Sequence, residues 1–462
     1  MFELGTIFPL LTISYHLTPY DLVLLPIYFG AIYYFGNKYR QRLRPDPLLY
    51  KYYGQALTIK LSSSFMFCLV YMYYYDGGDT SGYYHWCNQW FKYFFNEPAI
   101  AISYILFDDE TSFYRFVSSS DFMNYLYLMK YGSNEDFFIR IASIVNFIGL
   151  NSFVCTSLLF GYLSFMGTWR LFIVFYDMYP HLRTQLALAT LFIPSVVFWG
   201  SGLMKDTLTL MGLCWLTYSL YFGLVKRQDM LRNIVWGLIM AMLTAKLKGY
   251  IILAFIPAAG YWAINMYKDK INSPIVRFMS GPVFMVIAAV LVLGLMQLVG
   301  DSLGKYSLDK LEQTAEGYQS WHQETGGMSY TIYGAGDFSI LGLLKTFPQG
   351  VNVTLFRPYL WEARSIFNLL AALESAYLLY YTLLILWRTK IVRLPAAIAL
   401  DSNILFCLMF SIILAFAVGI TSFNFGALVR YKIPVLPFYA IALILIDNAM
   451  KKESFLSRAL KR

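Results

Sequence analysis

Two carboxylates stand three positions apart in a short glycine-rich stretch, Asp76-Gly77-Gly78-Asp79, at the end of the apolar run 58–75. The glycines let the backbone turn sharply, so both carboxylates are expected beside the membrane surface. Partial desolvation there suits a carboxylate to general-base catalysis. Two alternatives stay open: the pair holds a divalent cation through its oxygens, or Asp79 caps the helix that follows.

A cation and a carboxylate, Lys205 and Asp206, stand where a second apolar run begins after Pro194 and Gly200. A lysine at a helix N-terminus is suited to phosphate, because free backbone N–H groups add to its charge. The alternative is a local ion pair between the two residues, or Asp206 acting as the helix cap.

Two lysines, Lys246 and Lys248, interrupt what is otherwise one long apolar stretch. Charges at such a depth in a membrane are unfavourable and usually face a cavity or a partner. The alternative is that each lysine snorkels to lipid headgroups.

Two arginines, Arg357 and Arg430, lie beside aromatic residues near further apolar runs. The planar guanidinium makes paired hydrogen bonds that suit phosphate and pyrophosphate. The neighbouring Tyr359, Trp361 and Tyr431 either stack on sugar rings or anchor the chain at the membrane interface.

The composition indicates what kind of scaffold holds these residues. Hydrophobic residues make up 58% of the 462, charged residues only 14%, and mean hydropathy is +0.53. So few charges could not cover the surface of a soluble protein, and the chain is predicted to be an all-α, polytopic membrane protein. The five cysteines form no CxxC or Cys/His cluster, so neither a structural zinc site nor a disulfide framework is expected.

Apolar segments of about the spanning length predict roughly eleven membrane helices. They are 20–36, 58–75, 138–165, 185–200, 204–224, 232–246, 248–267, 276–300, 366–387, 401–420 and 432–450. We expect an N-terminal helix and basic cytoplasmic loop in residues 1–57, and a transmembrane core in residues 58–462.

The formal net charge of +9 reports orientation more than an anionic partner, and nucleic acid is not expected. Basic loops of membrane proteins face the cytoplasm. The loop after the first helix carries Lys38, Arg40, Arg42, Arg44, Lys51 and Lys60. This places the N-terminus outside, and alternation then places the basic C-terminal tail in the cytoplasm.

Two outer segments, 76–137 and 301–365, are too long to be simple connections. The first contains two amphipathic stretches, 83–95 and 121–131, expected as helices on the membrane surface. The second is polar and glycine-rich, as in a lid or substrate-binding loop.

An acidic motif opening a large outer loop, with surface helices inside that loop, resembles the GT-C glycosyltransferase superfamily. The segments FWGSGLMKD at 198–206 and LVRYK at 428–432 resemble bacterial cell-envelope polysaccharide polymerases of the EpsG/Wzy kind. The resemblance implies a polyprenyl-phosphate or -pyrophosphate sugar donor, used at the outer face of the inner membrane, with Asp79 favoured over Asp76 as catalytic base. One extra helix before the core and the lack of a large soluble C-terminal domain depart from the family pattern, and the second departure argues against protein glycosylation.

The expected partners are a lipid-linked sugar donor, a glycan acceptor and membrane lipids. Donor phosphate contacts are expected from Lys205, Lys246, Lys248, Arg357 and Arg430. Further substrate contacts are expected from Asp206, Tyr83, Tyr359, Glu362, Arg364 and Lys432. The alternatives are a non-catalytic flippase or transporter of lipid-linked glycans, and a structural subunit of an envelope complex.

Overall fold

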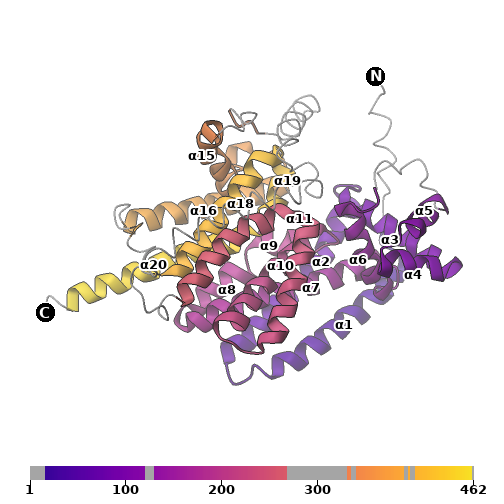
Figure 1. Ribbon diagram of the computed structural model, residues 1–462, viewed down its shortest axis with the longest axis horizontal. Helices are drawn as coiled ribbons and strands as arrows, with labels where there is room; N and C mark the ends of the chain where they lie inside the picture. The colour runs from indigo at the N-terminus through magenta and orange to yellow at the C-terminus, as the bar shows by residue number, and fades with distance from the viewer. Residues whose placement is uncertain are drawn as a thin grey trace. The chain divides into compact units, whose positions relative to one another are not determined.

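The computed structural model describes residues 16–119, 130–267, 330–333, 340–389, 394–395 and 401–459, and these form helices with no β-strand (Figure 1). Within these described ranges, six helices are long and apolar enough to cross a membrane. They are α2 (Pro47–Tyr73), α7 (Phe153–Met178), α10 with its π-helical end (Lys205–Val225), α11 (Met230–Tyr267), α16 (Ile366–Thr389) and α18 (Ser402–Ser422). The all-helical, multi-pass prediction is confirmed.

A seventh span is possible because α19 (Phe425–Tyr431) and α20 (Val435–Ala459) pass the same test together. The two helices are bent by 61° at a short break. Eleven spans were predicted, and the described residues support six or seven by length and composition. The expected span 276–300 lies outside the described residues.

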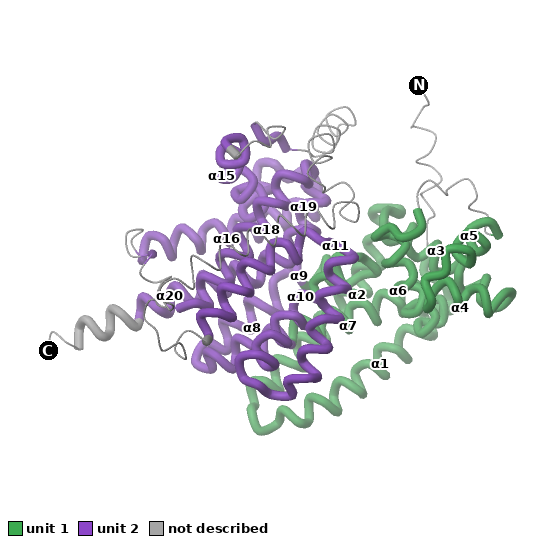
Figure 2. The backbone as a smooth tube through the Cα atoms, in the orientation of Figure 1, with its two compact units in different colours: residues 1–169, 197–211 green, residues 170–196, 212–462 purple. Residues whose placement is uncertain are grey.

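The chain forms two compact units, which we describe separately (Figure 2). Unit 1 comprises residues 1–169 and 197–211, and unit 2 comprises 170–196 and 212–462. The expected boundary between residues 57 and 58 lies inside α2.

The first helix, α1 (Pro19–Gln41), confirms the predicted segment 20–36 as a helix, although α1 is not among those apolar enough to span. The basic loop after it is shorter than predicted, because α2 already begins at Pro47 behind the capping carboxylate of Asp46. Lys51 and Lys60 are therefore helical, and Lys60 is only 3% exposed. Lys38 and Arg40 lie in the last turn of α1, so placing Lys38, Arg40, Lys51 and Lys60 in the loop was wrong.

The predicted single span 138–165 is two helices, α6 (Asn134–Ile148) and α7. Between them Leu150 and Asn151 adopt positive φ values of 52° and 57°. The Asn146 side chain donates to Asn151 Oδ1 at 2.9 Å, and the backbone N–H of Asn151 donates to the Asn146 carbonyl at 2.9 Å. These bonds stabilise a sharp turn that hydropathy does not reveal.

The predicted span 185–200 is also wrong as one helix. It consists of α8 (Arg183–Leu191) and α9 (Pro194–Trp199), each too short to span. Pro194 lacks an amide hydrogen and disfavours a helical residue before it, which accounts for the break.

The two predicted segments 232–246 and 248–267 are the two limbs of α11, which breaks at Lys248 (φ −148°, ψ 78°). The limb before the break packs on the middle of α10, where Thr244 lies against Gly212. Near the π-helical end of α10 both limbs return, since Asn233 lies against Gly223 and Trp262 stacks on Tyr221 with ring centres 6.1 Å apart. α11 is therefore a helical hairpin with Lys248 at its tip.

The first expected outer loop is mostly helical. α3 (Asp79–Asn96) confirms the helix predicted at 83–95, while α4 (Pro98–Phe107) and α5 (Glu110–Ser119) were not predicted. The other expected helix, 121–131, lies almost entirely outside the described residues. These helices and α6 enclose an aromatic core that includes Trp86, Trp90, Tyr104, Phe113 and Phe116.

The second expected loop, 301–365, is described only at 330–333 and from 340 onward. There α15 (Ile340–Phe356) and a 3₁₀ turn (Leu360–Glu362) replace the predicted loop. α15 packs closely on α18, where Gly350 meets Gly419 and the Thr354 hydroxyl donates to the Ala415 carbonyl at 2.6 Å.

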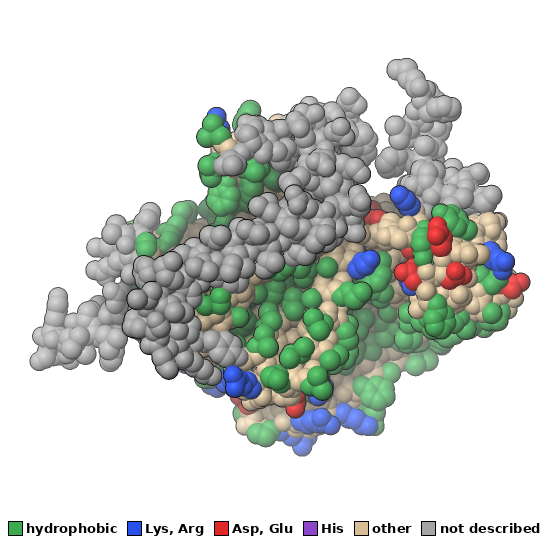
Figure 3. All heavy atoms as spheres, viewed as in Figure 1, with side chains coloured by type: hydrophobic (Ala, Val, Ile, Leu, Met, Phe, Trp, Pro, Cys, Tyr) green, Lys and Arg blue, Asp and Glu red, His purple; other side chains and the backbone are tan. Residues whose placement is uncertain are grey.

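Exposed apolar side chains mark the surface that suits lipid. On the face shown in Figure 3 the described surface over α11 is largely hydrophobic, and Lys and Arg side chains gather toward its lower edge. Leu231, Leu238 and Met242 on α11 are 77%, 66% and 65% exposed. This banding of apolar surface and basic ends is typical of membrane helices.

Candidate functional site

The acidic turn forms as predicted. Asp76 has φ 50° and is followed by Gly77 and Gly78 at 124° and 115°, a backbone path that glycine adopts readily. Asp79 then begins α3, and both carboxylates belong to exposed residues. Asp79 therefore lies in the first turn of a helix, where the helix dipole favours a negative charge.

The second predicted place is a buried turn. Residues 200–204 are buried, Lys205 begins α10, and Asp206 is 4% exposed. The turn is closed by Thr207, whose hydroxyl donates to the Gly202 carbonyl at 2.7 Å. The predicted helix start at Lys205 is confirmed.

The acidic turn at residues 76–79 and the buried turn at residues 200–204 come together inside unit 1. The Thr80 hydroxyl in the first turn of α3 donates to the Leu203 carbonyl at 3.0 Å, just before α10. The Lys205 ammonium lies 5.7 Å from the centre of the Tyr83 ring. Asp79, Tyr83 and Lys205 therefore lie near the N-termini of α3 and α10, which the hydrogen bond from Thr80 to Leu203 links.

Lys205 has a partner that the sequence did not indicate. Its ammonium lies 2.5 Å from Glu135 Oε1, and the side chains are 17% and 46% exposed. Glu135 is in the first turn of α6, behind the cap that Ser133 provides. The Ser-Asn-Glu-Asp run was a helix-start signal, but only the fold brings this carboxylate to Lys205. A phosphate that binds Lys205 therefore has to compete with the Glu135 carboxylate for the Lys205 ammonium.

The lysine at the tip of the α11 hairpin is held within unit 2. Lys248 is 9% exposed, and its ammonium lies 3.8 Å from the centre of the Tyr431 ring on α19. A cation this close to an aromatic face is stabilised by the ring quadrupole. Lys246, by contrast, is exposed. The prediction that lysines at this depth contact a partner thus fits Lys248.

The arginine that follows α15 is held by a carboxylate. Arg357 Nε donates to both oxygens of Glu362 at 3.0 Å, and Nη2 also donates to Oε1. Glu362 Oε2 accepts from the Tyr359 amide at 2.8 Å. The guanidinium lies 5.2 Å from the Phe425 ring and 5.4 Å from the Tyr330 ring. The pair is a pre-formed arginine–carboxylate unit against an aromatic wall.

Lys432 supports this unit from below the surface. It is 0% exposed and donates to the Arg357 carbonyl at 3.1 Å and to Ser375 Oγ at 2.8 Å. Lys432 therefore positions the backbone that carries Arg357. Arg364 is exposed, and Tyr359 stacks on Trp361 with ring centres 4.8 Å apart.

Four cations, Lys248, Arg357, Arg430 and Lys432, thus gather around the short helix α19. Arg430 lies in the last turn of α19, with its guanidinium 6.0 Å from the Tyr431 ring. We call these four residues the α19 cluster. Positive charge beside aromatic rings at a helix break can bind a phosphate whose lipid lies in the membrane.

The candidate residues therefore form two sets, one in each unit. Tyr330, Phe425 and Glu135 belong to them but were not predicted, because apolar and single acidic residues carry no distinctive pattern. Within the described ranges, no group of three or more His, Cys, Asp or Glu residues could hold a metal ion.

Comparisons with protein-family models, curated proteins and solved structures found no match to this chain.

Proposed function

We propose that the protein is an integral-membrane glycosyltransferase, or a polysaccharide polymerase of the same chemistry, that uses a polyprenyl-phosphate or -pyrophosphate sugar donor at the outer face of the inner membrane. The α19 cluster carries the proposal, because it concentrates cations at a break between membrane-level helices. Arg357 and Arg430 supply the bidentate donors that phosphate oxygens accept.

In this proposal Asp79 is the general base. It removes the proton from an acceptor hydroxyl as that oxygen attacks the anomeric carbon of the donor sugar. The bond from that carbon to the lipid phosphate breaks, and cations stabilise the charge on the departing phosphate. The exposed position of Asp79 leaves it accessible to an acceptor.

The test of the base is Asp79→Asn in the purified full chain, assayed for sugar transfer from a polyprenyl-phosphate donor. We expect transfer to fall at least about a hundredfold, since general-base catalysis contributes roughly 10²–10⁴-fold. Glu97→Gln is the matched control, because Glu97 is an exposed carboxylate in the same unit whose side chain makes no capping bond. Wild-type transfer by Asp79→Asn would exclude this role.

The test of the phosphate site is donor binding by Arg357→Ala. Loss of a charge-assisted hydrogen bond predicts roughly tenfold to hundredfold weaker binding. Arg388→Ala is the control, because Arg388 is a half-exposed arginine at the far end of α16. Equal donor affinity in Arg357→Ala and Arg388→Ala would remove the assignment.

The transporter alternative is favoured by one observation. Lys60 is buried near the middle of α2, where its ammonium donates to the Val197 carbonyl at 3.3 Å. Ionisable groups inside membrane helices often mark transport paths. If Lys60→Met stops movement of a lipid-linked glycan across vesicles while Asp79→Asn leaves it intact, the protein is a transporter.

A further inference from the structure

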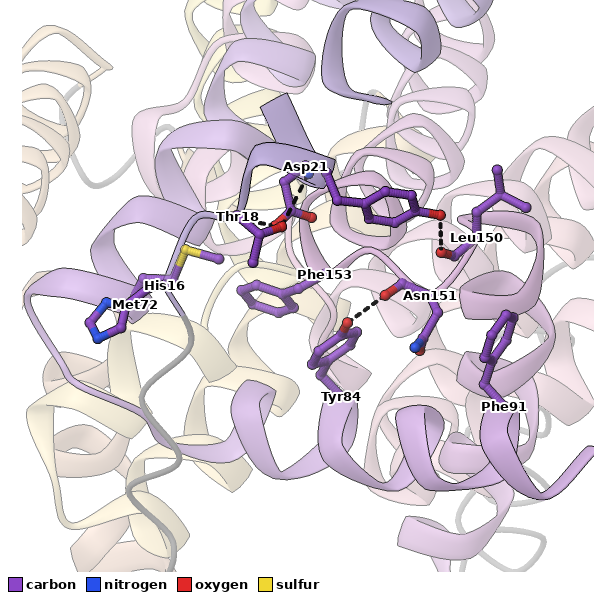
Figure 4. Close-up of a pocket in the computed structure, with 10 residues that line it drawn as sticks. His16, Thr18, Asp21, Met72, Tyr84, Phe91, Leu150, Asn151 and Phe153 are labelled. Atoms are coloured by element: carbon purple, nitrogen blue, oxygen red, sulfur yellow. Dashed lines mark hydrogen bonds between the residues drawn. The ribbon is translucent and has the colours of Figure 1, made fainter. Parts of the chain in front are cut away.

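A cavity of about 510 Å³ lies in unit 1, outside both sets of predicted residues (Figure 4). The start of α1, the end of α2, helix α3 and the turn between α6 and α7 border it, and it is partly open to the surface. Its volume is within the range of about 300–1,000 Å³ that is usual for small-molecule sites.

Aromatic rings form much of the cavity wall. Tyr84 and Phe153 lie side by side with ring centres 5.2 Å apart (Figure 4). The Tyr84 hydroxyl donates to the Asn151 carbonyl at 2.6 Å, which fixes its ring. Phe91 is seven residues after Tyr84 on α3 and also lines the cavity. Tyr84 and Phe153 are only 8% and 3% exposed, so the partly exposed Phe91 presents most of the aromatic surface of the wall.

The cavity wall carries the carboxylate of Asp21. Asp21 accepts from the hydroxyls of Thr18 and Ser152 at 2.6 Å each, so it is fixed in place. The remaining polar groups include the Asn151 amide and the His16 ring, and no Lys or Arg is among the residues found to line the cavity. An anionic phosphate is therefore disfavoured here, and a neutral polyhydroxyl ligand fits.

We propose that this cavity binds a neutral sugar unit of the acceptor glycan. The C–H face of a pyranose packs chiefly on Phe91, next to the small accessible parts of Tyr84 and Phe153, and its hydroxyls hydrogen-bond to polar groups of the wall. The inference rests on the proposed function, because it takes the acceptor to be a glycan. Tyr83 and Tyr84 are adjacent on α3, one beside Lys205 and the other in the cavity, so the helix that Asp79 begins borders both sites.

The experiment measures binding of methyl glycosides of glucose, galactose and N-acetylglucosamine to the full chain in nanodiscs by saturation-transfer NMR. Inorganic phosphate and glucuronate serve as anionic probes. We expect at least one neutral glycoside to bind, with phosphate unable to displace it. Phe91→Leu, which removes the flat ring and keeps most of the volume, should weaken binding at least about fivefold. Phe107→Ala is the control, since Phe107 is 77% exposed on α4.

The inference is overturned if no neutral glycoside binds, if phosphate displaces the glycoside, or if Phe91→Leu binds as wild type does. Should Phe91→Leu fail to fold, glycoside binding is measured with Tyr84→Phe instead. This variant retains the ring but removes the hydrogen bond that fixes it to the Asn151 carbonyl. The proposed function fails separately: Asp79→Asn should keep glycoside binding and lose transfer. If Asp79→Asn retains both glycoside binding and sugar transfer, Asp79 is not the general base, and the proposal that the cavity binds a sugar is unaffected.

Discussion

The ion pair between Lys205 and Glu135 decides how much positive charge unit 1 offers to a phosphate. Glu135 is the more exposed partner, at 46% against 17%. Neutralising it in Glu135→Gln should release Lys205, and if Lys205 binds donor phosphate, donor affinity should rise about threefold to tenfold. Titration of a fluorescent polyprenyl-phosphate analogue measures this.

The opposite change, Lys205→Ala, should lower donor affinity, and Glu97→Gln should leave it as it is. If Glu135→Gln and Lys205→Ala both bind the donor as wild type does, the ion pair only joins α6 to α10. That result would leave the α19 cluster as the sole phosphate site under test.

Cys87, in α3, shows how burial controls side-chain chemistry. All five cysteines are buried and none forms a disulfide, and desolvation raises the pKa of the Cys87 thiol to about 12. Because the thiolate is the reactive form, we expect no maleimide labelling of Cys87 in the native protein at pH 8. Mass spectrometry should find the label at Cys87 only after denaturation. Rapid native labelling would show that the aromatic core around α3 opens.

At the level of helices, the sequence predicted breaks where a charge interrupts an apolar run, whereas the break before Pro194 was missed. Lys248 was predicted to lie at a turn, and it forms the tip of the α11 hairpin. Asp79 was predicted near a helix start, and it begins α3. Such breaks are local, so single residues are enough to predict them.

Breaks that depend on hydrogen bonding were not predictable from hydropathy. The α6–α7 turn depends on Asn146 bonding to Asn151, two polar residues within a run that is otherwise largely apolar. Helices α4 and α5 were missed because each has only ten residues and is held by packing of Tyr104 and Phe113 in a shared core. Their stability depends on contacts from elsewhere in the chain.

The contact between Lys248 and Tyr431 should hold α19 against the α11 hairpin. Lys248→Met keeps the apolar stem and removes the charge, so we expect faster amide hydrogen exchange across Phe425–Tyr431. A loss of about 1 kcal/mol from the cation–π contact corresponds to roughly a fivefold increase in rate. Lys246→Met, at an exposed position two residues away, should leave exchange unchanged. Equal exchange in both variants would show that α19 is held by its apolar packing alone.

For the whole molecule, composition was sufficient to predict a multi-pass helical protein, because so low a charged fraction excludes a soluble surface. Composition could not predict the division into two units, because it depends on packing between distant segments. Residues 197–211, for example, belong with unit 1 although the chain on either side belongs to unit 2. Hydrogen bonds such as that from Thr80 to Leu203 produce this grouping.

The predicted orientation, with the N-terminus outside and the C-terminus cytoplasmic, requires α1 to cross the membrane, although α1 is not among the helices apolar enough to span. It depends on the basic residues at and around the turn between α1 and α2. Arg40, in the last turn of α1, also has a structural role, since its Nε donates to the Tyr50 carbonyl at 2.9 Å and its guanidinium lies 4.0 Å from the Tyr50 ring. Arg42, Arg44 and Lys51 are exposed, so their charge is free to act as a topology signal.

Replacing Arg42, Arg44 and Lys51 together by Gln should therefore invert the first helix in a measurable fraction of molecules, whereas Arg40→Gln should lower stability and keep the orientation. In the wild type, a fluorescent-protein fusion at the C-terminus should fluoresce, and an alkaline phosphatase fusion there should be inactive. An N-terminal epitope should be accessible from outside intact cells, and the triple variant should lose part of that accessibility. An active C-terminal phosphatase would show that the C-terminus lies outside the cytoplasm. The predicted orientation would then be wrong, and the sides of the membrane predicted for the α19 cluster and Asp79 would have to be exchanged.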